Sequence, residues 1–241
     1  MKRLLLICLM FCSLMVQAQD LKSLFVAMPD SLSPLWTEVN RADFGDFLAS
    51  NMKARVRNRF GNFSEMLKLT DDYLLMQSTS VSTMEMKLLP VNDSVNIICM
   101  VQTYQAPVAD SRISFYDTAW KELPVSQFIQ LPAESVFYKT PETTAQADSL
   151  ADVRKYADMY LLKASLSEKG KTLSFVYTTP EYMDKENSDR LTSSLNMKQL
   201  EYEWRDGKFQ PKNLCVLRGS GCICFVTSIN CFSVYCVLKH K

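Results

Sequence analysis

The side chains that could support nucleophilic or metal chemistry are few in this 241-residue chain. Its one histidine, His240, is the penultimate residue. Ser-His-Asp and Cys-His nucleophiles and histidine zinc sites all need an imidazole that is held inside a site. Cys99 lies in the apolar run 95–101, where a buried thiol is inert. We therefore expect no nucleophilic triad and no histidine zinc site, and we expect Cys99 to be a core residue.

The acidic segment 184–189 could offer calcium ligands at its first, third and fourth positions. An EF-hand loop also needs Gly at position 6 and Glu at position 12, where this chain has Asp189 and Leu195. A solvated loop is therefore the better interpretation. A phosphate cradle is absent as well, because the glycines of segment 19–213 are isolated: Gly45, Gly61, Gly170 and Gly207. We expect no catalytic, cofactor-binding or metal-binding residues and no cofactor.

Two pairs of carboxylates could supply general acid and base groups, Asp43 with Asp46 and Asp71 with Asp72. Roles on a helix face and in turn capping explain both pairs more simply. A carboxylate-dependent hydrolase acting on glycans would need no histidine, so this class of enzyme stays open as an alternative.

Two further sets of residues could form a binding surface. Basic side chains alternate along segment 53–60, and on a strand they share one face: Lys53, Arg55, Arg57 and Arg59. They could bind an anionic surface, a glycan or a lipid headgroup, although a solvated outer face is the simpler interpretation. Aromatic residues on strands could form a ligand platform, although core packing explains them equally well: Tyr104, Tyr177, Trp204 and Phe209.

The hydrophobic pattern predicts an α+β fold, with antiparallel sheets and helices packed on one side. Helical spacing or capping signals favour four helices, at 20–28, 40–52 (with Asn40 as a possible N-cap), 145–156 and 184–195. A first β region contains runs at 73–78, 83–89, 95–104 and 112–116. A second contains runs at 160–167, 172–178, 197–204 and 208–210.

The two β regions resemble each other, which suggests an internal duplication with halves 19–140 and 141–213. Asp-Asp-Tyr-Leu-Leu at 71–75 matches Asp-Met-Tyr-Leu-Leu at 158–162. The separation in sequence between Tyr73 and Phe115 equals that between Tyr160 and Tyr202. Chance among common β residues is the competing explanation.

The same regions carry a family resemblance. The segments are Phe-Val-Ala-Met-Pro-Asp-Ser at 25–31, Leu-Thr-Asp-Asp-Tyr-Leu at 69–74 and Tyr-Glu-Trp-Arg-Asp-Gly-Lys-Phe at 202–209. With them the chain resembles an exported family of Bacteroidales, domain-of-unknown-function family 3256, over about residues 20–211. The resemblance implies an envelope or secreted protein and no particular activity. It also implies that the domain ends near Pro211.

The first 18 residues have the pattern of a cleaved signal peptide. Lys2 and Arg3 precede a mostly apolar run at 4–16, and Val-Gln-Ala at 16–18 places small residues where signal peptidase needs them. The run is shorter than the roughly 20 residues of a membrane-spanning helix. We expect cleavage after Ala18 and a periplasmic or secreted mature protein that does not span the membrane.

The net charge of segment 19–213 argues against one further class of function, nucleic-acid binding. Segment 19–213 has 22 basic and 26 acidic side chains, a net charge of −4, which gives no electrostatic basis for binding nucleic acid. We expect a non-catalytic binding or interaction module of the cell envelope, whose partner is an envelope protein or a glycan.

The tail 214–241 differs sharply from the domain at 19–213. It has no Asp or Glu and contains five of the six cysteines that remain after signal cleavage: Cys215, Cys222, Cys224, Cys231 and Cys236. In order of preference, the tail is the product of a shifted or read-through gene end, a marginal membrane anchor at 222–238, or a cysteine site. We predict that it lies outside the fold.

A chain ending at Asn213 should therefore melt at the same temperature as the full mature chain in a thermal denaturation experiment. A melting temperature several degrees lower in the shortened chain would show that the tail belongs to the fold. Solubility that depends on detergent in the long form alone would instead identify an anchor.

Overall fold

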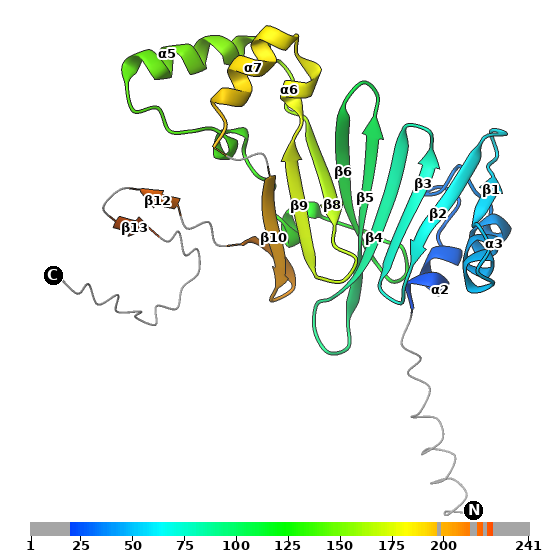
Figure 1. The fold of residues 1–241 in the computed structure, drawn as a ribbon. Coiled ribbons are helices and arrows are strands. Elements are labelled where there is room, and N and C mark those ends of the chain that lie inside the picture. Colours follow the sequence, from blue (N-terminus) through cyan, green and yellow to red (C-terminus); the bar gives the residue numbers. More distant parts are fainter. Residues whose placement is uncertain (1–19, 197–198, 213–215, 219–220, 224–241) are drawn as a thin grey trace, which may run out of the picture.

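The computed structural model describes residues 20–196, 199–212, 216–218 and 221–223. Within these residues the chain forms a seven-stranded antiparallel sheet with strand order β1 to β7. A four-stranded antiparallel sheet has the order β11-β10-β9-β8. Both sheets are meanders, in which strands adjacent in sequence are adjacent in space (Figure 1). The predicted α+β fold with antiparallel sheets is confirmed.

The large sheet contains β1 (Arg55–Arg57), β2 (Phe63–Leu69), β3 (Tyr73–Thr79), β4 (Ser82–Pro90), β5 (Asn96–Gln105), β6 (Ala109–Asp117) and β7 (Glu122–Leu123). The small sheet contains β8 (Leu162–Leu166), β9 (Thr172–Tyr177), β10 (Gln199–Arg205) and β11 (Lys208–Pro211). In the tail, β12 (Val216–Arg218) pairs with β13 (Gly221–Ile223). The predicted signal peptide and the rest of the tail lie outside the described residues, so both stay predictions.

Short turns fix the register of the meanders. Asp206 and Gly207 have φ values of 50° and 73°, the left-handed pair that a two-residue hairpin loop between β10 and β11 requires. In the turn between β4 and β5, Asn92 Oδ1 accepts two backbone N–H bonds, each of 2.9 Å. The sequence predicts both turns, because these residue types favour such geometry.

The helices are α2 (Leu21–Val26), α3 (Glu38–Ala49), α4 (Val125–Phe128), α5 (Thr144–Val153), α6 (Thr179–Tyr182) and α7 (Lys185–Ser193), with 3-10 turns at Glu134–Phe137 and Arg154–Tyr156. Asn40, expected as an N-cap, instead sits inside the first turn of α3. Thr37 is the N-cap: its hydroxyl accepts the Asn40 N–H at 3.2 Å, and the Asn40 side chain accepts the Thr37 N–H at 3.2 Å. This capping box satisfies donors that would otherwise lack partners.

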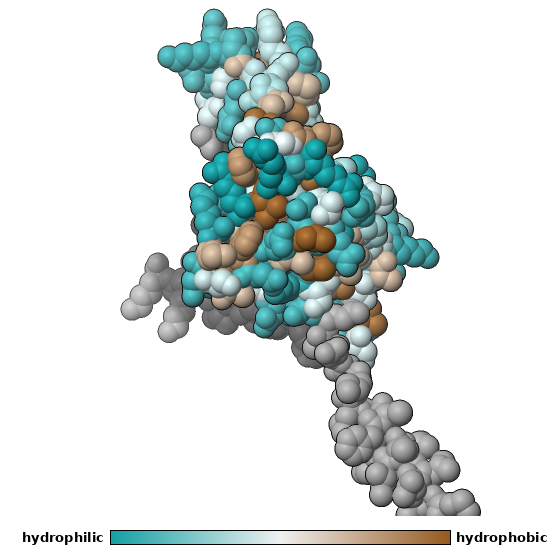
Figure 2. Space-filling model, turned by 90° about the vertical axis from the view of Figure 1, so that its right-hand side faces the viewer, coloured by the Kyte–Doolittle hydropathy of each residue, from teal (hydrophilic) through white to brown (hydrophobic). Residues whose placement is uncertain are grey.

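Helices α2 and α3 cover one face of the large sheet. Alternate residues of the strands face them, so this layer of the core is apolar and rich in methionine: Met28, Met66, Met76, Met84, Met86 and Met100. Unbranched thioether side chains fill the irregular space between a helix pair and a twisted sheet. Seen from the side of β1 and α3, the surface is mostly hydrophilic with isolated hydrophobic patches (Figure 2).

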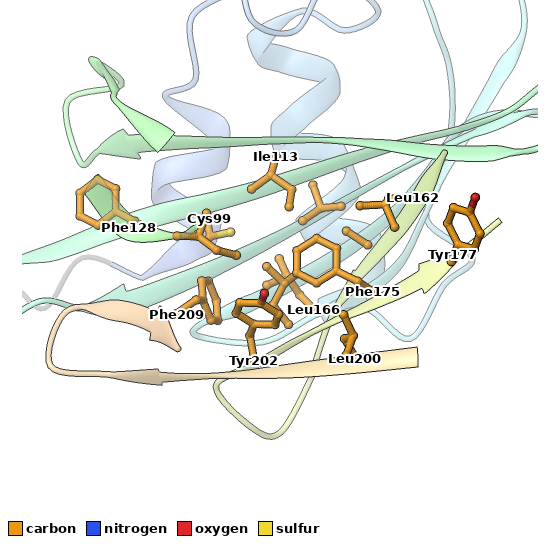
Figure 3. Packing of buried hydrophobic residues seen from close by; sticks show 14 of the residues in the cluster. Cys99, Ile113, Phe128, Leu162, Leu166, Phe175, Tyr177, Leu200, Tyr202 and Phe209 are labelled. Carbon is orange, nitrogen blue, oxygen red and sulfur yellow. The ribbon is translucent and has the colours of Figure 1, made fainter. Parts of the chain in front are cut away.

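The small sheet packs on the opposite face of the large sheet, where β8 contacts β4, β5 and β6. Cys99 and Ile113 of the large sheet face Leu162 and Phe175 of the small sheet across a continuous apolar core (Figure 3). Phe128 of α4 closes this core at one end, with its ring centroid 4.9 Å from that of Phe115. The middle strands of the large sheet are therefore buried on both faces.

Two charged residues of β4 lie inside the interface between the sheets. Glu85 is 8% exposed and Lys87 is 1% exposed. Glu85 Oε2 accepts the backbone N–H of Leu166 at 2.8 Å. Lys87 Nζ donates to the backbone oxygen of Glu168 at 2.7 Å and forms an ion pair of 2.9 Å with Asp72. These bonds fix the β8–β9 hairpin in position on the large sheet.

The residues that suggested a duplication occupy comparable but not identical places. Tyr73 begins β3, whereas Tyr160 precedes β8; Phe115 lies in β6 and Tyr202 lies in β10. Strands β4 and β5 lie between the members of the first pair, whereas β8, β9 and two helices, α6 and α7, lie between the members of the second. The division into halves 19–140 and 141–213 stays a prediction.

Burial raises the pKa of Glu85, and hydrogen bonds from Leu166 N–H and the Tyr73 hydroxyl oppose that rise without cancelling it. The folded state therefore holds this proton more tightly than the unfolded state does. Protonated Glu85 therefore favours the folded state at low pH. This contribution to the free energy of unfolding is lost as pH rises from 4.5, the ordinary pKa of the group, through its raised pKa in the folded state.

Glu85→Gln removes this titration. Relative to the variant, the wild type should lose stability as pH rises through this window, as measured by urea unfolding at a series of pH values. Glu122→Gln, at an exposed position, is the control and should leave the profile unchanged. A wild-type profile parallel to that of Glu85→Gln would contradict the prediction.

Candidate functional site

Strands β1 and β2 and the end of β3 at 77–79 present an open face on the side of the small sheet, whereas Tyr73 and Leu75 of β3 pack against the core between the sheets. The small sheet stands beside β4 to β6, and β1 to β3 lie at the opposite end (Figure 1). Arg55 and Arg57 of β1 are exposed on this face, whereas Val56 between them is buried toward α2 and α3. In the antiparallel register, Arg55 lies opposite Glu65 and Arg57 lies opposite Phe63.

The prediction that four basic residues share one strand face is wrong for its two ends. Strand β1 includes Arg55 and Arg57 but neither Lys53 nor Arg59. Hydrogen bonds explain the short strand: the Arg55 N–H donates to the Lys53 oxygen, and the Arg59 N–H donates to the Leu35 oxygen. These bonds draw the flanking residues out of the β ladder.

The two flanking cations are also neutralised by carboxylates. Lys53 forms an ion pair of 3.1 Å with Glu65. Arg59 pairs with Asp30, which also pairs with the buried Arg41 at 3.0 Å. Hydrogen bonds from Arg41 and Arg59 lower the pKa of Asp30, so this carboxylate stays charged. The positive charge of the row is therefore concentrated at Arg55 and Arg57.

Arg55 and Arg57 are held against an aromatic ring instead of a carboxylate. Their guanidinium carbons lie 4.1 Å and 5.5 Å from the centroid of the Phe63 ring. Neither arginine forms an ion pair with any carboxylate of the described residues. Phe63 is itself 46% exposed, so the ring and both cations are accessible to a ligand. Cation–π contact orders the guanidinium groups while leaving their donors free.

A groove of about 720 Å³ adjoins this cluster on the open sheet face. Its lining combines Arg55, Phe63 and Glu65 with neutral amide and hydroxyl side chains: Asn62, Ser64, Gln77, Thr79, Ser80 and Gln105. Gln77 Nε2 donates to the backbone oxygens of Thr79 at 2.6 Å and Ser82 at 3.3 Å, which orients this side chain on the β3–β4 hairpin. The groove therefore offers a cationic and aromatic end together with an uncharged, hydrogen-bonding wall.

The predicted aromatic set divides between core and surface. Tyr177, Trp204 and Phe209 are buried in the core between the sheets, whereas Tyr104 is exposed. Trp204 also donates its indole N–H to the Pro90 oxygen at 2.7 Å. Core packing is thus the role of three of the four, and they do not form an exposed platform.

One member of each predicted acidic pair has a charged partner, whereas Asp43 and Asp71 form no ion pair among the described residues. Asp46 pairs with Lys22 at 3.1 Å, and Asp72 pairs with Lys87. The carboxylate of Asp184 accepts the Asn187 N–H at 3.1 Å and so caps α7, at the start of the helix that the sequence predicts over 184–195. Within the described ranges, no three His, Cys, Asp or Glu side chains are grouped so as to hold a metal ion.

Cys99 is fully buried between the sheets, as expected for a core residue, and burial raises the pKa of its thiol. A thiol in this environment stays protonated and unreactive at neutral pH.

A second polar cluster joins the helical segment after β7 to the small sheet. Glu134 Oε1 accepts hydrogen bonds from Tyr138 and, at 2.9 Å, from Tyr177, and Arg154 donates to Glu134 Oε2 at 3.0 Å. Burial, reinforced by Glu134, raises the pKa of Tyr138, so this hydroxyl remains a protonated donor. The cluster is saturated by its own members, and its role is to position these segments.

Sequence reasoning missed Phe63 and the Glu134 cluster. Phe63 stands across a turn from the basic row, and the turn signal Gly61-Asn62 could have identified it as a cross-strand neighbour of Arg57. The members of the Glu134 cluster come from separate elements, and no spacing rule relates them.

Comparison with known proteins identifies relatives without an assigned activity. Residues 13–209 match the family described as "Protein of unknown function (DUF3256)". A solved structure, that of a domain of an uncharacterized protein from Porphyromonas gingivalis W83, is 31% identical with a TM-score of 0.71. The match covers 81% of this chain and 100% of that one. No curated protein matches the chain.

Helix length and composition bear on membrane insertion. Among the residues with described positions, none of the helices has the length and apolar character needed to cross a membrane.

Changing Arg55, Arg57 and Arg59 together to Gln should change the free energy of unfolding by less than about 2 kcal/mol, because the variant loses exposed cation–π contacts and one surface ion pair. Chemical denaturation measures this change. Phe115→Ala, which leaves a cavity in the core, should cost about 3–5 kcal/mol in the same assay. Loss of folding in the arginine variant would show that these side chains are paired in the interior.

Proposed function

The chain belongs to domain-of-unknown-function family 3256, and we propose that it is an exported, non-catalytic binding module of the cell envelope. Its binding site is the groove at the open end of the large sheet together with Arg57, which adjoins the groove beside Phe63, and its ligand is anionic. One observation carries this proposal: two guanidinium groups are held over an exposed aromatic ring and have no carboxylate partner within the described chain.

Adjacent cations repel each other, and a protein that needed them for stability alone would pair them with acids. The domain is not short of carboxylates, because segment 19–213 contains more acidic than basic side chains. Glu65 lies opposite Arg55 in the register, yet it pairs with Lys53. Arg55 and Arg57 thus keep their donors available, which suits recognition of an anion.

Export is supported by the sequence of the first 18 residues, with its basic start, apolar run and small residues before the expected cleavage point after Ala18. A binding function is supported by the state of the acidic pairs. One member of each pair, Asp46 and Asp72, is engaged by a lysine, and no observation favours the alternative of a carboxylate-dependent glycan hydrolase.

The proposal predicts that the mature chain, starting at Gln19, sediments with envelopes isolated from the producing cells at physiological salt. Arg55→Gln combined with Arg57→Gln should reduce the bound fraction about tenfold, because charge-assisted hydrogen bonds are lost. Lys121→Gln combined with Lys185→Gln is the matched control. It removes the same charge at exposed sites outside the groove and should leave binding unchanged.

Equal retention of the arginine variant and the wild type would overturn the assignment of the site. Amino-terminal sequencing of the protein from cell fractions tests export separately. A chain that retains Met1 and stays in the cytoplasm would overturn that part.

A further inference from the structure

We propose that the groove binds an acidic polysaccharide, with Arg55 and Arg57 on the carboxylate of a uronate sugar and Phe63 against its ring. This inference rests on the proposed function and specifies its ligand class. Three properties of the groove lead to it: the small number of available cations, the uncharged wall and the exposed aromatic ring.

The charge of the site suits a ligand that places one carboxylate on a single pair of arginines. Two arginines are available, whereas Lys53 and Arg59 are engaged by Glu65 and Asp30. A guanidinium group matches a carboxylate through two parallel N–H bonds. Glu65 also lines the groove, so the carboxylate of the ligand is directed to the arginine end of the site and uncharged sugar groups lie beside Glu65.

The charge pattern also disfavours nucleic acid and anionic membranes. Both present dense phosphate or headgroup charge, and proteins bind them with clusters of several cations. The domain has a net charge of −4 across segment 19–213, and its accessible cationic site has two members in the described structure.

The wall of the groove suits hydroxyl groups. Five of its nine residues carry neutral amide or hydroxyl side chains that are at least partly exposed, whereas the hydroxyl of Ser64 is buried and donates to the Ser78 oxygen at 2.6 Å. Gln77 is oriented by its bonds to Thr79 and Ser82. Asn62 and Gln105 are exposed, and their side-chain amides have no hydrogen-bond partner among the described residues. An amide both donates and accepts, which matches the hydroxyl groups of a sugar.

Phe63 supplies the apolar contact that sugar recognition also needs. One face of a pyranose ring is formed largely by C–H groups, which pack against an aromatic ring in the same way as other apolar surface. At 46% exposure, Phe63 has the area for this contact next to the two guanidinium groups. The groove volume of about 720 Å³ falls within the ordinary range of ligand sites, about 300–1,000 Å³.

The test is isothermal titration of the full mature chain with three polymers. Polygalacturonate is the uronate probe, carboxyl-reduced polygalacturonate is the same backbone without charge, and poly-L-glutamate is an acidic peptide. We expect binding to polygalacturonate, at least tenfold weaker binding after carboxyl reduction, and weaker binding to poly-L-glutamate than to polygalacturonate.

Variants locate the interaction. Arg55→Gln with Arg57→Gln should reproduce the loss seen on carboxyl reduction. Phe63→Ala should weaken binding of polygalacturonate while leaving the melting temperature near that of the wild type, because the ring is partly exposed. Lys121→Gln with Lys185→Gln should bind as the wild type does.

Equal or tighter binding of poly-L-glutamate would overturn the glycan inference and identify an acidic peptide ligand, leaving the proposed binding module intact. Absence of polygalacturonate binding, with arginine-dependent sedimentation of envelopes retained, would overturn only the ligand class. Absence of both would overturn the proposed function as well. Binding that survives the paired arginine change would overturn the site.

Discussion

Burial of the middle strands of the large sheet on both faces is the constraint from which the rest of the structure follows. Strand β5 directs Ile98 and Met100 toward the helix layer and Cys99 and Val101 toward the small sheet. A strand enclosed in this way must be apolar at nearly every position, as the run 97–101 is. The large sheet therefore needs two covering layers, and the small sheet reaches only part of its face. The open end at β1 to β3 results from this unequal coverage.

Polar groups inside the interface determine where the second layer sits. Apolar contacts between two sheet faces tolerate sliding, whereas Glu85 and Lys87 make directed bonds to the β8–β9 hairpin at Leu166 and Glu168. Buried charges are costly unless they are bonded, so a displaced hairpin would leave both without partners. The position of the groove is thus fixed indirectly, because the same bonds hold the small sheet away from β1.

The sequence predicts the local features of this fold better than its long-range ones. Alternating and apolar runs locate most strands, and Asp206-Gly207 identifies the final hairpin, because these signals depend on neighbouring residues. The extent of β1 was overestimated, since the Lys53 oxygen accepts a turn hydrogen bond from the Arg55 N–H and the Arg59 N–H donates to the Leu35 oxygen, and these bonds end the strand early. The sequence predicts only part of the candidate site. The alternating spacing of the basic residues identifies Arg55 and Arg57, but the contribution of Phe63 depends on strand pairing across a turn. Gln77 and Gln105 join the groove through the sheet order, which no local pattern specifies.

The methionine-rich layer beneath α2 and α3 affects how the protein reacts with oxidants. Conversion of a thioether to a sulfoxide places a polar group where an apolar one was packed, so oxidation inside this layer would disrupt the core. Its members are nearly inaccessible, with Met76 and Met86 at 0% exposure, whereas Met52 and Met159 are open to solvent. Peroxide should reach the surface pair first and the inner set only when the helix layer opens. The rate at which the inner methionines oxidise, relative to Met52 and Met159, therefore reports how often α2 and α3 separate from the sheet.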